Sequence, residues 1–206
     1  MKTLFYFISV LTIFNTLSHP VIYKGGWVYQ SSFMPEMNNT SVGYSVSSKY
    51  SLMANSNHFK NIDNYRDYTL GANFLLKRWL NNDSQGNIYA GVHGGYYEDD
   101  FSSGEVLHSF VMGDWESREH YVAFKSDGYF YNNRKQYSYT ARYGIAPYVA
   151  GMDELQTWLV FQAFYYEEQS KTAVITPMLR FFYRNVLWEV GYSTRGQSYL
   201  TLMVHY

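Results

Sequence analysis

The stretch 67-DYTLGANFLLK-77 determines the fold class of this 206-residue chain. Apolar and polar side chains alternate along it, and a period of two places them on opposite faces of a β-strand. The apolar face consists of Tyr68, Leu70, Ala72, Phe74 and Leu76, and the other face of Asp67, Thr69, Gly71, Asn73 and Lys77. About 9–11 residues with an apolar outer face and a polar or small inner face suffice to cross a bilayer. The stretch therefore predicts a membrane-spanning strand.

The same alternation recurs along the rest of the chain. The further stretches are 41–50, 87–96, 136–145, 158–165, 173–181, 186–193 and 199–206. Throughout these stretches, every Asp, Glu, Lys and Arg falls on one face. A Lys or Arg that faces lipid at mid-membrane costs about 2–4 kcal/mol, so this asymmetry favours a barrel in lipid. A tyrosine-rich soluble β-protein remains the alternative.

The polar faces of these strands supply the candidate residues of a barrel lumen. These candidates are Lys49, Asp67, Lys77, His93, Arg142, Gln162, Arg180 and Glu189. Because they carry both signs of charge, we expect them to pair with one another and to fill much of a narrow bore.

Two less regular stretches, 105–115 and 118–126, complete the predicted set of strands. Of the two faces of 105–115, we expect the one that carries His108 to be lumenal. The fold predicted over residues 41–206 is all-β, an antiparallel up-and-down transmembrane β-barrel of about ten strands, with eight as the alternative. Pro177 cannot donate a ladder hydrogen bond, so a bulge is expected at that position.

Composition agrees with strands in a membrane. The chain holds 23 Tyr, 14 Phe and 5 Trp, and aromatic residues with a polar tip gather at membrane–water boundaries. Its 16 Lys and Arg balance 17 Asp and Glu, which gives no electrostatic basis for a nucleic-acid partner. The absence of cysteine excludes disulfides and thiolate chemistry. No cofactor is expected.

The amino terminus reads as a secretory signal. Lys2 precedes a short apolar run, and Thr16 and Ser18 are the small residues expected before a cleavage at His19. We therefore predict a signal peptide over 1–18, and a periplasmic pre-barrel segment or plug over 19–40.

The carboxyl terminus ends in an aromatic residue that follows apolar residues at alternate positions. The members of this signature are Leu200, Leu202, Val204 and Tyr206. The pattern resembles the terminal-strand signature of bacterial outer-membrane β-barrels. That resemblance implies a location in the outer membrane of a Gram-negative cell, delivery by the barrel assembly machinery, and contact with outer-membrane lipid and lipopolysaccharide.

Three short motifs resemble elements of small barrel proteins associated with heavy-metal resistance. They are Lys24-Gly25-Gly26-Trp27, Leu75-Leu76-Lys77-Arg78-Trp79 and Asp114-Trp115-Glu116. This resemblance transfers no functional residue. Imidazole and thioether side chains suit copper, and the weak metal-ligand candidates are His93, His108, Met112, Met178, Met203 and His205. A methionine in a lumen is also an ordinary filler of space.

Several functions remain open. A structural role, or restricted passage of small solutes or metal ions, fits a filled barrel without enzymatic activity. A lipid-modifying enzyme of the outer leaflet is the alternative of another class, but His108 and Ser109 are adjacent and point to opposite faces of a strand. Surface adhesion is the third hypothesis, through longer polar connections expected outside the cell at 54–65 and 127–135.

Overall fold

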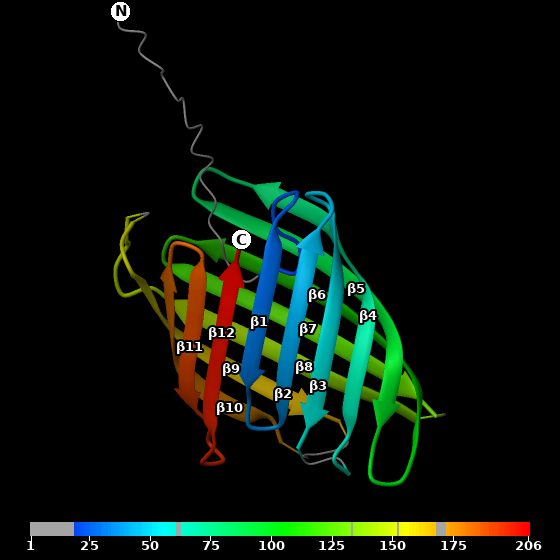
Figure 1. Cartoon of the computed structure of the whole chain (residues 1–206). Helices are drawn as coiled ribbons and strands as arrows, with labels where there is room; N and C mark the ends of the chain where they lie inside the picture. The colour runs from blue at the N-terminus through cyan, green and yellow to red at the C-terminus, as the bar shows by residue number, and fades with distance from the viewer. Residues whose placement is uncertain (1–18, 61–62, 133, 152, 168–171) are drawn as a thin grey trace, which may run out of the picture.

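The chain folds into a closed barrel in which each strand pairs antiparallel with its neighbours in sequence (Figure 1). The computed structural model describes residues 19–206 except 61–62, 133, 152 and 168–171. The predicted signal peptide, 1–18, lies outside the described residues. The first and last strands, β1 (Trp27–Phe33) and β12 (Ser198–His205), pair with each other and close the barrel. A transmembrane-type antiparallel barrel is therefore the observed architecture.

Between these two, the strands follow in sequence order. They are β2 (Met37–Ser45), β3 (Tyr50–Phe59), β4 (Arg66–Leu80), β5 (Ser84–Glu98), β6 (Ser103–Ser117), β7 (His120–Tyr131), β8 (Arg134–Ile145), β9 (Gln156–Tyr166), β10 (Val174–Tyr183) and β11 (Val186–Tyr192). We call the end that holds the start of β1 and the end of β12 the terminal end, and the opposite end the distal end (Figure 1). Among the described residues, no helix is long and apolar enough to cross a bilayer.

The barrel has 12 strands, so the predicted number of about ten, or eight, was wrong. The strands that escaped prediction are β1 and β3. Outward-facing Ser56 and His58 interrupt the apolar alternation of β3, and β1 has only 7 residues. Both are held in the sheet because each pairs along its length with a strand on either side, which satisfies backbone groups regardless of side-chain pattern.

The predicted boundary at residue 41 was also wrong. Residues 19–40 are not a segment before the barrel, because β1 begins at Trp27 and β2 at Met37. Residues 19–26 precede the sheet, residues 34–36 connect β1 to β2, and Val21 in the first of these segments is buried. The expected loops 54–65 and 127–135 shrink in the same way, since β3 runs to Phe59, β7 to Tyr131, and β8 starts at Arg134.

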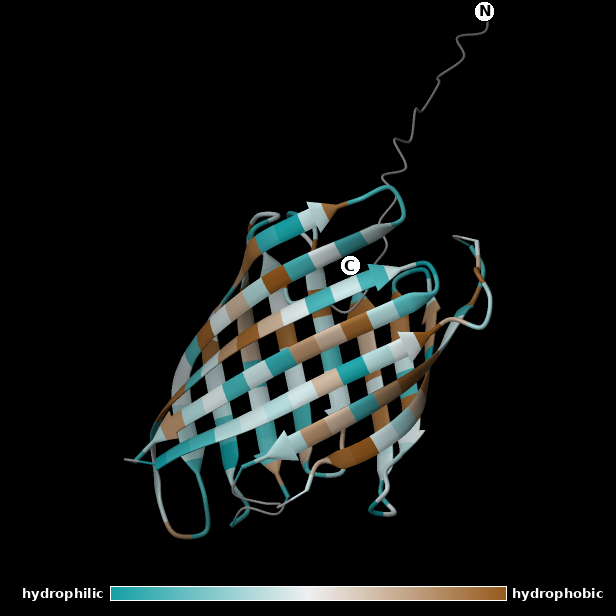
Figure 2. Ribbon diagram, turned by 180° about the vertical axis from the view of Figure 1, so that it is seen from behind, coloured by the Kyte–Doolittle hydropathy of each residue, from teal (hydrophilic) through white to brown (hydrophobic). Residues whose placement is uncertain are grey.

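Hydrophilic and hydrophobic residues alternate along the strands (Figure 2), and the exposed side chains of the barrel wall are largely apolar. Outward side chains such as Leu70, Val92, Val111 and Leu202 are exposed, whereas Arg180 on the inner face is 0% exposed. This arrangement is the one that a hydrocarbon solvent requires, and it is opposite to that of a soluble β-protein with a dry apolar core.

A bulge in β4 corrects the predicted facing of Lys77. The register with β5 shifts between Leu75 and Lys77, so Lys77 lies opposite Ile88 on the outer face, and Arg78 takes the inner face opposite Asn87. The extra residue reverses which side chains point inward beyond it. Lys77 is three positions before the end of β4, in keeping with a charge near a membrane boundary.

Two further expectations about single residues need correction. Lys49 is exposed in the connection between β2 and β3 rather than in the lumen, because β2 ends at Ser45. Pro177 causes no bulge, since β10 pairs with β9 in unbroken register through it. It lies one residue beyond the last β10–β11 pair, Met178 with Gly191, where no ladder donor is required of it.

Candidate functional site

The lumen contains a cavity of about 240 Å³, enclosed by both halves of the sheet. One wall, from β1 to β4, carries amides and hydroxyls and no charge at the cavity surface: Gln30, Ser32, Asn39, Ser41, Asn55, Asn57 and Asn73. The facing wall, from β6 to β9 and β12, carries charges and rings: His108, Phe110, Tyr121, Lys125, Asp127, Tyr129, Arg142, Phe164 and Tyr199. The lumen therefore offers a small polar chamber with chemically unlike walls.

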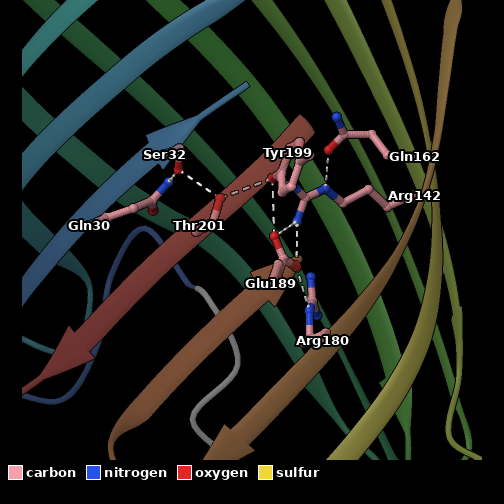
Figure 3. A network of polar contacts seen from close by, with 8 residues as sticks. All are labelled: Gln30, Ser32, Arg142, Gln162, Arg180, Glu189, Tyr199 and Thr201. Carbon is pink, nitrogen blue, oxygen red and sulfur yellow. Dashed lines mark hydrogen bonds and ion pairs between the residues drawn. The ribbon is translucent and has the colours of Figure 1, made fainter. Parts of the chain in front are cut away.

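A buried ion cluster supports the charged wall (Figure 3). Glu189 on β11 lies between two arginines, at 2.7 Å from Nε of Arg180 and 3.2 Å from Nη1 of Arg142. The guanidinium of Arg180 also lies 4.6 Å from the ring centre of Tyr121. Charges withdrawn from water are tolerated only when such partners are close.

Neutral groups extend this cluster around the barrel (Figure 3). Arg142 donates from Nε to Gln162 at 2.8 Å and from Nη2 to the hydroxyl of Tyr199 at 2.7 Å. Tyr199 donates to Glu189 and accepts a hydrogen bond from Thr201, which also contacts Ser32 of β1. The network thus joins β8, β9, β11, β12 and β1, and holds Arg142 in a fixed orientation.

A second polar chain crosses the lumen. His93 contacts Asn73 at 2.9 Å through Nε2 and His108 at 3.1 Å, Nδ1 to Nδ1. His108 in turn contacts Asp127 at 2.8 Å, and Asp127 pairs with Lys125 at 2.7 Å. The chain runs from β4 through β5 and β6 to β7, so that it stiffens this part of the lumenal wall.

Residues 19–22, which we call the inserted segment, occupy the lumen at the terminal end. The carbonyl of Pro20 accepts hydrogen bonds from Oγ of Ser51 at 2.8 Å and Nδ2 of Asn73 at 3.2 Å. The amide of Ile22 donates to Oγ of Ser45 at 3.1 Å. Val21 packs with Tyr89 and Phe110. These contacts place the segment across the bore between the cavity and the terminal end.

Carboxylates surround the start of the inserted segment. Nδ1 of His19 lies 3.4 Å from Asp114, and Nε2 lies 3.9 Å from Glu116. Gln85 donates to Glu116 and contacts His19, while Asn87 donates to Asp114 at 2.7 Å. The imidazole of His19 thus lies among polar side chains of β5 and β6, next to the hydrogen bonds that hold Pro20 and Ile22.

Aromatic side chains close the distal end. The distal aromatic cluster consists of Phe59, Tyr65, Tyr97, Val106, Tyr129, Tyr131, Phe164 and Tyr166, all nearly inaccessible to solvent. Tyr65 stacks on Tyr97 with ring centres 5.5 Å apart, and Phe59 meets Tyr129 edge to face. Because Tyr129 and Tyr131 point inward here, they are not available as the exposed contact surface that the adhesin hypothesis requires.

The structure brings most of the predicted lumenal residues together. Asp67, His93, Arg142, Gln162, Arg180 and Glu189 point inward, whereas Lys49 and Lys77 do not. Asp67 is fully buried and accepts a hydrogen bond from Asn57 at 2.8 Å, apart from the arginine cluster. The carboxyl-terminal signature residues Leu200, Leu202 and Tyr206 face outward and are exposed, and Val204 alternates with them.

The weak metal-ligand candidates are scattered. His93 and His108 adjoin, but Met112 and Met178 pack against one apolar cluster and Met203 belongs to another. His205 is buried elsewhere, near His19. In the part of the chain that the structure describes, no three His, Cys, Asp or Glu side chains are grouped so as to hold a metal ion.

Sequence reasoning missed several lumenal groups. Arg78 faces inward only because of the bulge. Lys125 lies in the stretch 118–126, whose facing was not predicted, and Asp127 lies in the expected connection 127–135. Asp114 lies near the end of the predicted stretch 105–115 and Glu116 lies beyond it, but β6 continues to Ser117. Their alternation with Trp115 was the signal that could have placed them on one face of a strand.

The comparisons with known proteins agree with this architecture. No protein-family model matches the chain, and no curated protein is significantly similar in sequence. The solved structure of the KdgM porin superposes with a TM-score of 0.52 at 14% identity, covering 88% of this chain and 98% of that chain. The chain has the fold of a porin. The KdgM porin in complex with disordered oligogalacturonate gives the same values.

A looser likeness relates the chain to a larger porin. OccK11 (OpdR) of Pseudomonas aeruginosa superposes with a TM-score of 0.43 at 8% identity, covering 88% of this chain and 66% of that chain. The likeness to the KdgM porin does not extend to the heavy-metal-resistance barrels that the short motifs at 24–27, 75–79 and 114–116 resemble. The comparison with heavy-metal resistance is therefore not supported.

Proposed function

We propose that this protein is an outer-membrane porin that passes small solutes through its lumen, and that the structure represents its closed state. The observation that carries the proposal is the polar cavity between two obstructions, the distal aromatic cluster and the inserted segment. A barrel with a purely structural role has no need of an internal chamber of about 240 Å³ lined by amides and charges. The fold shared with the KdgM porin supports the same conclusion.

The inserted segment is the obstruction that is easier to move. It is held at Pro20 by two side-chain hydrogen bonds, from Ser51 and Asn73. A hydrogen bond contributes about 0.5–1.5 kcal/mol net, so the pair stabilises the closed state by about 2 kcal/mol. Such a difference corresponds to a shift of about 30-fold in the equilibrium between closed and open lumens.

Planar-bilayer conductance of the refolded protein tests the proposal. The double variant Ser51→Ala/Asn73→Ala should show a much higher open probability than the wild type. The matched control Ser47→Ala/Asn81→Ala removes the same two groups from connections at the terminal end, where they bond only to nearby residues. It should behave as the wild type does. If wild type and tether variant are both electrically silent, the passage hypothesis fails and a structural role replaces it.

Modification of outer-leaflet lipid by an enzyme is the alternative function. Ser109 faces outward on β6, because it pairs with Val92 on the outer face, whereas His108 points inward. A nucleophile and base of this local pair therefore cannot meet. Unchanged lipid A mass spectra on deletion and overexpression would agree with a porin, and a new acylation state would favour the enzyme.

A further inference from the structure

The charges around the cavity are engaged with one another. Lys125 pairs with Asp127 at 2.7 Å, and Arg142 shares Glu189 with Arg180. Arg142 uses Nε, Nη1 and Nη2 on protein partners. Lys125 and Arg142, the two cations that line the cavity among the described residues, thus both have an anionic partner within the protein. Three cations against two carboxylates also disfavour a cationic solute at this wall.

The opposite wall presents hydrogen-bonding groups without charge. The amide nitrogens of Gln30, Asn39 and Asn55 donate to Ser32, Asn57 and Thr69 respectively. Their carbonyl oxygens accept no hydrogen bond among the described residues, and all three residues line the cavity. Fixed acceptors of this kind suit solute hydroxyl groups, which donate, and they repel a carboxylate.

Aromatic rings complete the chamber on the charged wall. Phe110, Tyr121, Tyr129, Phe164 and Tyr199 line it. Ring faces and edges provide apolar contact for the C–H groups of a saccharide, while the amide wall meets its hydroxyls. The combination of uncharged acceptors, aromatic contact and ions that already have partners within the protein is the environment of a neutral polyol.

We propose that the chamber selects small uncharged polyhydroxylated solutes of monosaccharide size over charged solutes of the same size. This inference rests on the proposed passage through the lumen and names its substrate class. The inferred solute is neutral, whereas the oligogalacturonate in complex with the KdgM porin is a polyacid. In this chain Arg142, on the cavity wall, is bound to Glu189 and Gln162.

Size-matched sugars provide the test. In liposome-swelling assays with wild type and the Ser51→Ala/Asn73→Ala tether variant, galactose should enter at least about tenfold faster than galacturonate or galactosamine, since an uncompensated charge away from water is costly. Galacturonate entry as fast as that of galactose would overturn the inference while leaving passage intact.

A variant that removes the partner of one lumenal cation tests whether ion pairing sets the selectivity. Asp127→Asn frees Lys125, whose side chain is 36% exposed, and should raise galacturonate entry relative to galactose by about tenfold. Thr140→Lys places a new cation on the same cavity wall without removing a partner. It replaces Asp127→Asn in this test if that variant does not fold. If the ratio of galacturonate entry to galactose entry is unchanged from wild type in both variants, ion pairing of the lumenal charges does not set the selectivity.

Binding separates the inference from the proposed function. Saturation-transfer NMR on the detergent-solubilised protein should detect saturable binding of galactose, weakened severalfold in Asn55→Ala, and no saturable binding of galacturonate. If neither sugar enters liposomes but galactose alone binds, the porin proposal fails and the ligand class stands. Stronger binding of galacturonate, or binding of neither sugar, refutes the ligand class.

Discussion

Removing the carboxylate of Glu189 is the sharpest test of the lumenal ion cluster. Arg180 is 0% exposed, and Glu189 is its ion partner at 2.7 Å, while Arg142 relies on the same carboxylate at 3.2 Å. Glu189→Gln keeps the shape but leaves two guanidinium groups with no ion partner at this position. Breaking a buried pair costs about 3–5 kcal/mol, so we expect a loss of about 4 kcal/mol in the free energy of unfolding.

Urea unfolding in detergent, followed by tryptophan fluorescence and by migration of unheated samples on gels, measures this loss. Glu98→Gln is the control, because its pair with Arg66 spans 3.9 Å at a half-exposed position and should change stability by no more than about 0.5 kcal/mol. Adding Arg180→Met to Glu189→Gln should restore part of the stability, since an apolar side chain replaces the unpaired cation. A Glu189→Gln barrel as stable as the control would refute the reasoning.

Three further perturbations have defined outcomes. Burial raises the pKa of Glu36, in the connection between β1 and β2. The folded state therefore binds this proton more tightly than the unfolded state does, and the free energy of unfolding falls as pH rises through the range where this carboxyl ionises. Unfolding measured at several pH values should show that decline flattened in Glu36→Gln. A Cβ on Gly95 would lie 1.9 Å from the carbonyl oxygen of Tyr68, so Gly95→Ala should lower the free energy of unfolding by at least about 2 kcal/mol. In the control Gly94→Ala the new Cβ has no atom within 4 Å, so this variant should unfold at the same urea concentration as the wild type. Tyr97→Ala opens the distal aromatic cluster, and we expect larger single-channel conductance at a stability cost of about 3–5 kcal/mol, so an unchanged conductance would place the constriction elsewhere.

The sequence predicted the architecture wherever one face of a strand is uniformly apolar. The stretch 67–77 and the carboxyl-terminal stretch both became strands with the expected outer face up to the bulge. Prediction failed at β3, where outward Ser56 and His58 lack an apolar signal, because pairing with β2 and β4 rather than side-chain pattern holds that strand. Strand number therefore could not be read from periodicity alone.

The site was less predictable than the fold. Charge on the inner face identified Arg142, Arg180 and Glu189, but which carboxylate serves which arginine depends on register between strands distant in sequence. The bulge near Lys77 exchanges the facing of two adjacent basic residues, and a single extra residue leaves no composition signal. The inserted segment likewise depends on contacts of Pro20 with side chains 31 and 53 positions away.

The seam of the barrel has a consequence for the order of events in biogenesis. Trp27 and Tyr206 exchange both backbone hydrogen bonds, each 2.8 Å long, so Tyr206, directly after β12, completes the junction with β1. Until that residue has been made and delivered, β1 keeps an unsatisfied row of donors and acceptors along one margin. The earliest strand to emerge is thus the last to be sealed, and it must be shielded from foreign strands for the whole interval.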